Sequence, residues 1–220
     1  MDFIKVASAC PVTRVSDVDY NVLNILKCVD EAEKNGSKFI VFPELSITSY
    51  TCGDLFLQDY LLKKCVAGIK NIAENTKEKD LLIAVGAPLI KGSILYNCAV
   101  ILFKGTVLGV VPKSFIPNYS EFYEKRWFTE GVNVENDTID LSFQKNIPFG
   151  TNLIFSSNIA NFGFEICEDL WVTVPPSSYL ALMGAHIIGN LSASNELVSK
   201  ADYRRSLISN QSARTMCSYV

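Results

Sequence analysis

The segment Lys38-Phe-Ile-Val-Phe-Pro-Glu44 is a short apolar run that is followed at once by proline and a carboxylate. An uninterrupted run of this length is typical of a strand buried on both faces, and it delivers Glu44 to the carboxyl end of that strand. Upstream, residues 5–10 alternate as in a strand, and residues 16–36 carry apolar side chains at helical spacing between a capping residue and a glycine. We therefore expect a strand–helix–strand unit that ends at Glu44.

The rest of the chain continues to mix helices with strands and hairpins. Helical spacing of apolar residues predicts helices over 58–75, 177–183 and 196–214. Apolar or alternating runs predict strands over 81–87, 97–103, 106–111, 152–155, 161–166 and 185–189, and another that starts at 217. This mixture predicts an α/β class with a mixed sheet, and the lack of linkers and repeats predicts one domain over 1–220.

The composition is that of a packed globular domain, with 49% hydrophobic and 20% charged residues. The net charge is only -3 and no basic cluster occurs, which argues against binding to nucleic acid or to an anionic membrane. Apolar runs are too short for a membrane span, and the first residues lack the pattern of a signal peptide. We expect a cytoplasmic protein.

The cysteine and histidine content limits the kinds of catalytic and metal sites that the chain could form. The seven cysteines form no CxxC pair, which argues against a disulfide framework and against a zinc site. The single histidine, His186, lies in an apolar strand pattern and is expected to be a hydrogen-bonded core residue. Triads with a histidine base and metal sites built from several histidines are therefore poor interpretations, and we expect no metal site.

Glu44, Lys113 and Cys167 stand out because each is an ionisable residue at the end of an apolar strand. The segment Gly163-Phe-Glu-Ile-Cys-Glu-Asp-Leu-Trp171 runs from apolar into acidic residues, which predicts a sharp bend that exposes Cys167. A thiol of ordinary pKa is only a few per cent ionised at neutral pH, so it needs a base or a cation nearby. On these grounds alone, an inert core cysteine remains an open alternative.

A resemblance to a known family adds to this reading. Phe42-Pro-Glu44-Leu, Val111-Pro-Lys113 and Glu165-Ile-Cys167-Glu-Asp-Leu-Trp resemble, in this order, the Glu–Lys–Cys motifs of the nitrilase, or carbon-nitrogen hydrolase, superfamily. Further motifs narrow the resemblance to the N-terminal glutaminase domains of glutamine-dependent NAD synthetases: Pro117-Asn-Tyr119, Glu124-Lys-Arg126-Trp-Phe and Asn190-Leu-Ser-Ala-Ser194-Asn-Glu. The resemblance covers essentially the whole chain. It implies a four-layer αββα sandwich. It also implies a homo-oligomer, because members of this superfamily usually associate.

The resemblance also implies roles for the reactive residues. Glu44 matches the general base, Lys113 the cation beside the tetrahedral intermediate, and Cys167 the nucleophile that forms a glutamyl thioester and releases ammonia. Glu124 matches a supporting carboxylate that orients Lys113. One question stays open, because Glu165 shares a strand face with Cys167 and a nearby carboxylate would raise the pKa of the thiol.

The same comparison implies a pocket for L-glutamine. Tyr119, Ser194 and Lys200 match glutamine-binding positions, and Lys200 suits the α-carboxylate of the free amino acid. The backbone N–H of Glu168 follows the nucleophile and is expected to be a second oxyanion donor.

The resemblance further implies a partner domain. In this family ammonia passes to a C-terminal synthetase domain that uses ATP and magnesium to aminate nicotinic acid adenine dinucleotide. We find no phosphate-binding loop in 1–220, so we expect no cofactor here, and the strand that starts at 217 suggests that the glutaminase domain is incomplete at its C-terminus. Two alternatives stay open, a stand-alone amidase acting on another small amide and a non-catalytic scaffold that keeps the motifs.

Overall fold

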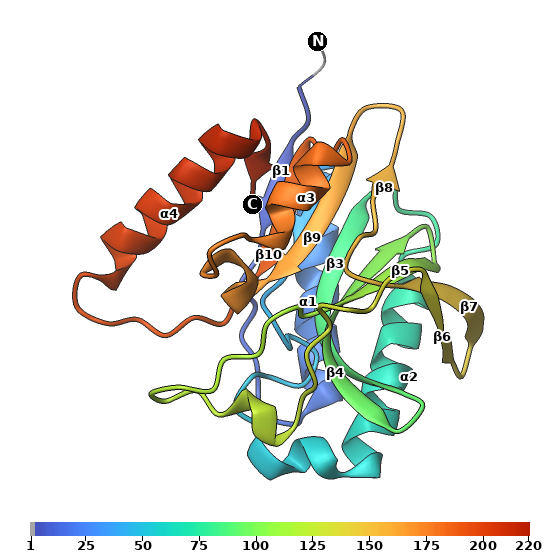
Figure 1. Cartoon of the computed structure of the whole chain (residues 1–220). Coiled ribbons are helices and arrows are strands. Elements are labelled where there is room, and N and C mark those ends of the chain that lie inside the picture. Colours follow the sequence, from blue (N-terminus) through green and yellow to red (C-terminus); the bar gives the residue numbers. More distant parts are fainter. Residues whose placement is uncertain (1–2) are drawn as a thin grey trace.

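The structure is a computed structural model, and it describes residues 3–220. Its strands form two sheets, which Figure 1 shows with helices outside them. The seven-stranded sheet has the order β1 (Val6–Ser8), β2 (Phe39–Val41), β3 (Leu82–Lys91), β4 (Ile94–Phe103), β5 (Thr106–Pro112), β7 (Gln144–Phe149) and β6 (Asp137–Leu141). The four-stranded sheet has the order β11 (Ser218–Tyr219), β10 (Ile187–Leu191), β9 (Asn161–Ile166) and β8 (Phe155–Ser156).

Helices cover the outer faces of the two sheets. The helices α1 (Val18–Lys34) and α2 (Asp59–Asn75) pack against the seven-stranded sheet, and α3 (Pro176–Leu182) packs on the four-stranded sheet. The helix α4 (Lys200–Thr215) contacts α3 and β11. Short 3₁₀ turns occur at Gly53–Leu57, Glu124–Arg126 and Cys167–Leu170. The predicted αββα sandwich of mixed α/β class is confirmed.

The strand β2 shows why the layers form. Phe39 and Val41 belong to the core between the sheets, whereas Ile40 belongs to the core under α1 and α2. Alternate residues of a strand point to opposite faces, so an uninterrupted apolar run contributes side chains to both cores. The Phe39 ring lies 5.4 Å from that of Phe162 and 5.7 Å from that of Phe164, both on β9 of the facing sheet.

The sequence analysis missed the hairpin of β6 and β7. Ile139, Leu141, Ile147 and Phe149 are buried and alternate with exposed residues, so the period-two signal is present. The turn at Ser142 and Phe143 lacks the Gly, Asn or Asp that usually marks a hairpin, which hid it. The predicted strand over 152–155 is also displaced, because β8 begins only at Phe155.

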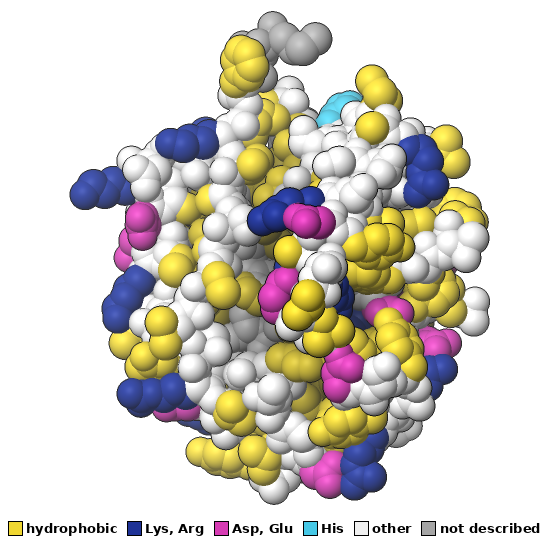
Figure 2. Space-filling view, turned by 90° about the vertical axis from the view of Figure 1, so that its left-hand side faces the viewer, with side chains coloured by type: hydrophobic (Ala, Val, Ile, Leu, Met, Phe, Trp, Pro, Cys, Tyr) yellow, Lys and Arg dark blue, Asp and Glu magenta, His cyan; other side chains and the backbone are white. Residues whose placement is uncertain are grey.

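Three further observations concern His186, the charges on the surface and the helices. His186 is exposed, so its predicted core position is wrong, although its Nδ1 does accept a hydrogen bond from the Asn161 amide at 3.1 Å. On the face shown in Figure 2, acidic and basic side chains are interspersed. Within residues 3–220, no helix combines the length and the apolar character that crossing a membrane requires.

Candidate active site

The candidate site lies where strands of both sheets end. Glu44 follows β2, Lys113 follows β5, and Cys167 follows β9. Gly86 on β3 allows the chain that carries Glu44 to pass close by, because a Cβ at Gly86 would lie 2.2 Å from the Leu45 backbone nitrogen. The fold thus brings together three residues that are far apart in the sequence.

A buried cluster of charges forms the centre of the site. Lys113 Nζ donates to Glu44 Oε1 at 2.6 Å and to both carboxylate oxygens of Glu124 at 2.9 Å. All three residues are at most 3% exposed. Burial alone would lower the pKa of Lys113, but the two carboxylates outweigh burial and hold the pKa above its ordinary value. The ammonium therefore stays charged at any physiological pH.

Polar neighbours fix the two carboxylates. Asn97 on β4 donates its side-chain N–H to Glu44 Oε1 at 2.7 Å, and the Ala193 amide donates to Glu44 Oε2 at 3.2 Å. Oε1 is thus shared by two side-chain donors, which leaves Oε2 as the less occupied oxygen. The Tyr50 hydroxyl donates to Glu124 Oε1 at 2.6 Å. Burial and the charge of Glu44 raise the pKa of Glu124.

Cys167 lies in the predicted bend, but it is buried, so the expectation that the bend exposes it is wrong. Its φ is +44°, a left-handed conformation that is unusual for a residue with a side chain. The Ser192 hydroxyl donates to Cys167 Sγ at 3.4 Å. Burial, followed by the charge of Glu44, raises the pKa of the thiol to about 12 against the opposing effect of Lys113. The thiol is therefore neutral at rest and needs a base to become a nucleophile.

Glu165 does not face the thiol. Its carboxylate accepts hydrogen bonds from the Ser177 amide at 2.7 Å and from the Tyr219 hydroxyl. The left-handed bend at Cys167 breaks the alternation of β9, so residues 165 and 167 no longer share a face. This geometry answers the question that the sequence left open.

The predicted glutamine-binding residues occupy two places. The Tyr119 hydroxyl lies 3.0 Å from both carboxylate oxygens of Glu168. Lys200 Nζ lies 5.1 Å from the centre of the Trp171 ring and donates a hydrogen bond to the Asn195 side chain. Burial raises the pKa of Glu168, and the charge of Lys200 opposes this effect. These charged and aromatic side chains form one cluster beside the nucleophile.

Ser194 lies on a different wall of the site. It lines a cavity of about 480 Å³ together with Glu44, Tyr50 and Ser192. This cavity contains the side chain that contacts the nucleophile and the carboxylate that is expected to act as its base.

The sequence analysis did not single out Asn97, Tyr50 or Asp169. Asn97 is fully buried and also accepts the Lys113 amide on its backbone oxygen at 2.7 Å. Asp169 is buried and accepts the amides of Phe115 and Ile166, both at 2.9 Å. A buried amide or carboxylate needs hydrogen-bond partners. A polar residue next to an apolar strand was therefore the signal by which the sequence could have indicated these residues.

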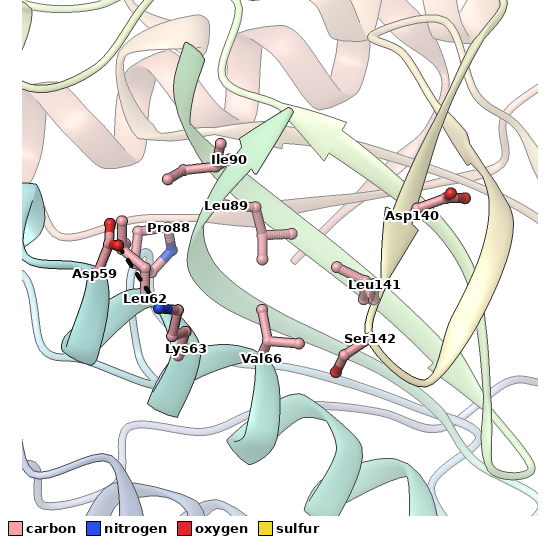
Figure 3. A pocket seen from close by; sticks show the side chains of 10 residues that line it. All are labelled: Asp59, Leu62, Lys63, Val66, Pro88, Leu89, Ile90, Asp140, Leu141 and Ser142. Atoms are coloured by element: carbon pink, nitrogen blue, oxygen red, sulfur yellow. Dashed lines mark ion pairs between the residues drawn. The ribbon is translucent and has the colours of Figure 1, made fainter. Parts of the chain in front are cut away.

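A second cavity, of about 310 Å³, lies between α2 and the β6–β7 hairpin (Figure 3). Its floor is apolar, and its charged groups are Asp140 and the pair of Asp59 and Lys63, which are 3.6 Å apart. It includes none of the candidate catalytic residues. Among residues 3–220, no group of three or more His, Cys, Asp or Glu side chains is placed to hold a metal ion.

Comparison with known proteins gives consistent matches. Residues 5–220 match the family model described as Carbon-nitrogen hydrolase. A glutamine-dependent NAD(+) synthetase of Mycobacterium tuberculosis is 39% identical, over 99% of this chain and 32% of the relative. The counterpart from Aquifex aeolicus is 34% identical, over 92% of this chain and 32% of the relative. The chain thus spans about a third of the length of these curated relatives.

Solved structures show the same relationships. The crystal structure of a glutamine-dependent NAD(+) synthetase from Cytophaga hutchinsonii has a TM-score of 0.88 and 32% identity, and the match covers 98% of this chain and 35% of that one. An amidase from Nesterenkonia sp. has a TM-score of 0.79 at 15% identity and covers 98% of this chain and 74% of that one. The second similarity concerns the fold alone.

Proposed function

This chain belongs to the carbon-nitrogen hydrolase family, and we propose that it is a glutamine amidohydrolase that supplies ammonia to a glutamine-dependent NAD synthetase. The observation that carries the proposal is the buried cluster in which Lys113 pairs with Glu44 and Glu124, because the charges of Glu44 and Lys113 act on the neutral thiol of Cys167. The named relatives support glutamine as the amide donor.

The proposed reaction uses Glu44 as the base. Glu44 Oε2 takes the proton of Cys167 Sγ, and the sulfur attacks the carboxamide carbon of glutamine. A positioned base of this kind contributes roughly 10²- to 10⁴-fold to the rate. The same carboxyl group then passes its proton to the leaving nitrogen, the C–N bond breaks, and ammonia leaves a glutamyl thioester on Cys167.

Lys113 and the backbone N–H of Glu168 stabilise the negative charge that develops on the substrate. The attacked carbonyl oxygen becomes negative in each tetrahedral intermediate, and one well-placed donor contributes about 10²- to 10³-fold. Glu124 holds Lys113 in place through two hydrogen bonds of 2.9 Å each. Glu44 next deprotonates a water that attacks the thioester, which releases glutamate and returns the proton to the thiol.

Substrate recognition is assigned to the residues around the nucleophile. Lys200 pairs with the α-carboxylate of glutamine, and Tyr119 and Ser194 contact the rest of the amino acid. Support comes from the short distances within the Tyr119–Glu168 pair and from the position of Ser194 in the cavity of Glu44.

The wider proposal concerns the partner domain. Ammonia would be consumed by a separate synthetase domain that holds ATP and magnesium and aminates nicotinic acid adenine dinucleotide. The greater length of the named relatives supports such a domain. A homo-oligomer and a cytoplasmic location are part of this proposal and rest on the family resemblance.

A stand-alone amidase is the second candidate, because the family description matched by residues 5–220, Carbon-nitrogen hydrolase, does not specify which amide is hydrolysed. Release of ammonia from L-glutamine, with Cys167→Ala as the control, tests the proposed function. We expect activity that Cys167→Ala abolishes and that falls about 10- to 10²-fold for an analogue without the α-carboxylate, since pairing that charged group is worth roughly 1.5–3 kcal/mol. Equal activity on the analogue would favour the amidase, and unchanged hydrolysis by Cys167→Ala would refute the thioester mechanism.

A further inference from the structure

A half-buried side chain on the neighbouring strand holds the backbone of the nucleophile. Asn190 on β10 accepts the amide N–H of Cys167 on its side-chain oxygen at 3.0 Å. The parallel register of the small sheet pairs Asn190 with Glu165, two residues before the nucleophile. Asn190 therefore reaches across the end of β9 and accepts the hydrogen bond of the Cys167 backbone N–H.

Asn190 is in turn fixed by two other residues. Its side-chain N–H donates to the Tyr219 hydroxyl of β11 at 2.8 Å and lies 3.5 Å from Glu165. The Tyr219 hydroxyl donates to the carboxylate of Glu165, which also accepts the Ser177 amide at the start of α3. Glu165 is 1% exposed. One polar network thus joins β9, β10, β11 and α3.

The network acts on a bend that is costly in itself. A left-handed φ is unfavourable for a residue with a side chain, so the φ of Cys167 must be held by its surroundings. The hydrogen bond from Cys167 to Asn190 is the direct restraint on that residue. Without this restraint the bend can relax, and the sulfur then moves relative to Glu44 and Lys113.

We infer that Asn190 is a positioning residue for the nucleophile, and that Glu165 and Tyr219 act through Asn190. The inference rests on the proposed function, because it takes Cys167 to be the nucleophile. It assigns the buried carboxylate of Glu165, which takes no part in the proposed reaction, a role in fixing Asn190. It also connects the placement of β11 to the reactivity of Cys167.

Asn190→Ala tests this inference, with Asn161→Ala as the matched control. Asn161 also lies on the small sheet and donates from its side chain to the Gly184 carbonyl at 2.9 Å, but at the start of β9. We expect Asn190→Ala to lower kcat for glutamine by about 10²-fold, which is the cost of misplacing a reacting group by roughly 1 Å, with KM changed less than about threefold. Asn161→Ala should leave both constants near the wild-type values.

Tyr219→Phe is the milder variant and loses only a hydroxyl. It should lower kcat by about 3- to 10-fold, as expected when one positioning hydrogen bond of roughly 1 kcal/mol is removed. A kcat of Asn190→Ala within threefold of Asn161→Ala, or a change in KM alone, would overturn the inference.

Iodoacetamide labelling separates this inference from the proposed function, because it needs no substrate. Cys167 should be alkylated about tenfold faster in Asn190→Ala than in wild type, since a released bend exposes the thiol, and at the wild-type rate in Asn161→Ala. A chain that fails to hydrolyse glutamine but shows this labelling pattern would refute the proposed function and support the positioning network. Equal labelling of both variants would refute the network.

Discussion

Alkylation of Cys167 should quicken steadily with pH and show no plateau in the range where ordinary thiols ionise. Burial and Glu44 raise the pKa of this thiol to about 12. The thiolate is the reactive form, so the rate constant for iodoacetamide should rise about tenfold per pH unit between roughly pH 7 and 10. Mass spectrometry of the peptide that contains Cys167 gives this rate directly.

The magnitude follows from the ionised fraction. At pH 8 a thiol of pKa 12 is ionised to about 10⁻⁴, whereas a free thiol of pKa about 8.5 is ionised to roughly a quarter. A more basic thiolate is more nucleophilic, by about 0.4–0.5 logarithmic units per pKa unit, which recovers about 40-fold. Cys167 should therefore react roughly 60-fold more slowly than a free thiol at pH 8.

Two variants move the rate in opposite directions. Glu44→Gln removes a charge that raises the pKa of the thiol, so labelling at pH 8 should become faster although glutamine hydrolysis is lost. Lys113→Met removes the charge that lowers this pKa, so labelling should become slower. Glu74→Gln removes one exposed negative charge on α2 and serves as the control, with an unchanged rate.

A plateau below about pH 9 in the wild-type chain would refute this reasoning. Slower labelling of Glu44→Gln would refute it as well. A plateau would mean that Cys167 is already a thiolate paired with Lys113, so that no base is needed to activate it. Slower labelling would mean that Glu44 assists ionisation of the thiol as a base more than its charge opposes it.

Three other predictions concern single residues. Glu124→Gln should lower kcat by about 10- to 10²-fold with little change in KM, because Lys113 loses a charged partner that positions it, and steady-state ammonia release measures both constants. Gly86→Ala should destabilise the fold by about 1–3 kcal/mol in chemical denaturation, because its Cβ would meet the Leu45 nitrogen at 2.2 Å; an unchanged midpoint would contradict this. Lys200→Ala should raise KM for glutamine by about 10- to 10²-fold and leave kcat within threefold, as expected for the loss of one charged hydrogen bond, and a fall in kcat alone would contradict the assigned role.

The elements that the sequence predicts well are those with a complete local signal. The helix over 58–75 is observed as α2 (Asp59–Asn75), because its apolar residues follow the helical period. The hairpin of β6 and β7 has the right alternation but no turn residues, so only pairing with the rest of the sheet reveals it. His186 was misplaced because it precedes β10 and lies at the exposed edge of the apolar run.

Sequence reasoning predicts which residues form the candidate site, but not how they are arranged. The resemblance named Glu44, Lys113, Cys167 and Glu124, and the contacts of Lys113 with both carboxylates are present, while the catalytic roles remain predictions. The direction of Glu165 depends on a left-handed φ at Cys167, which no local pattern of a non-glycine residue predicts. The contact of Asn190 with the nucleophile depends on the register of two strands that are far apart in the sequence.

Covalent capture by an electrophilic diazo-ketone analogue of glutamine tests the central claim most directly, because it needs only the pocket and a reactive thiol. Intact mass and a peptide map locate the adduct. We expect one adduct per chain, on Cys167, and protection by excess L-glutamine. An adduct elsewhere, or none while iodoacetamide still labels Cys167, would contradict the assignment of this chain as a glutamine amidohydrolase.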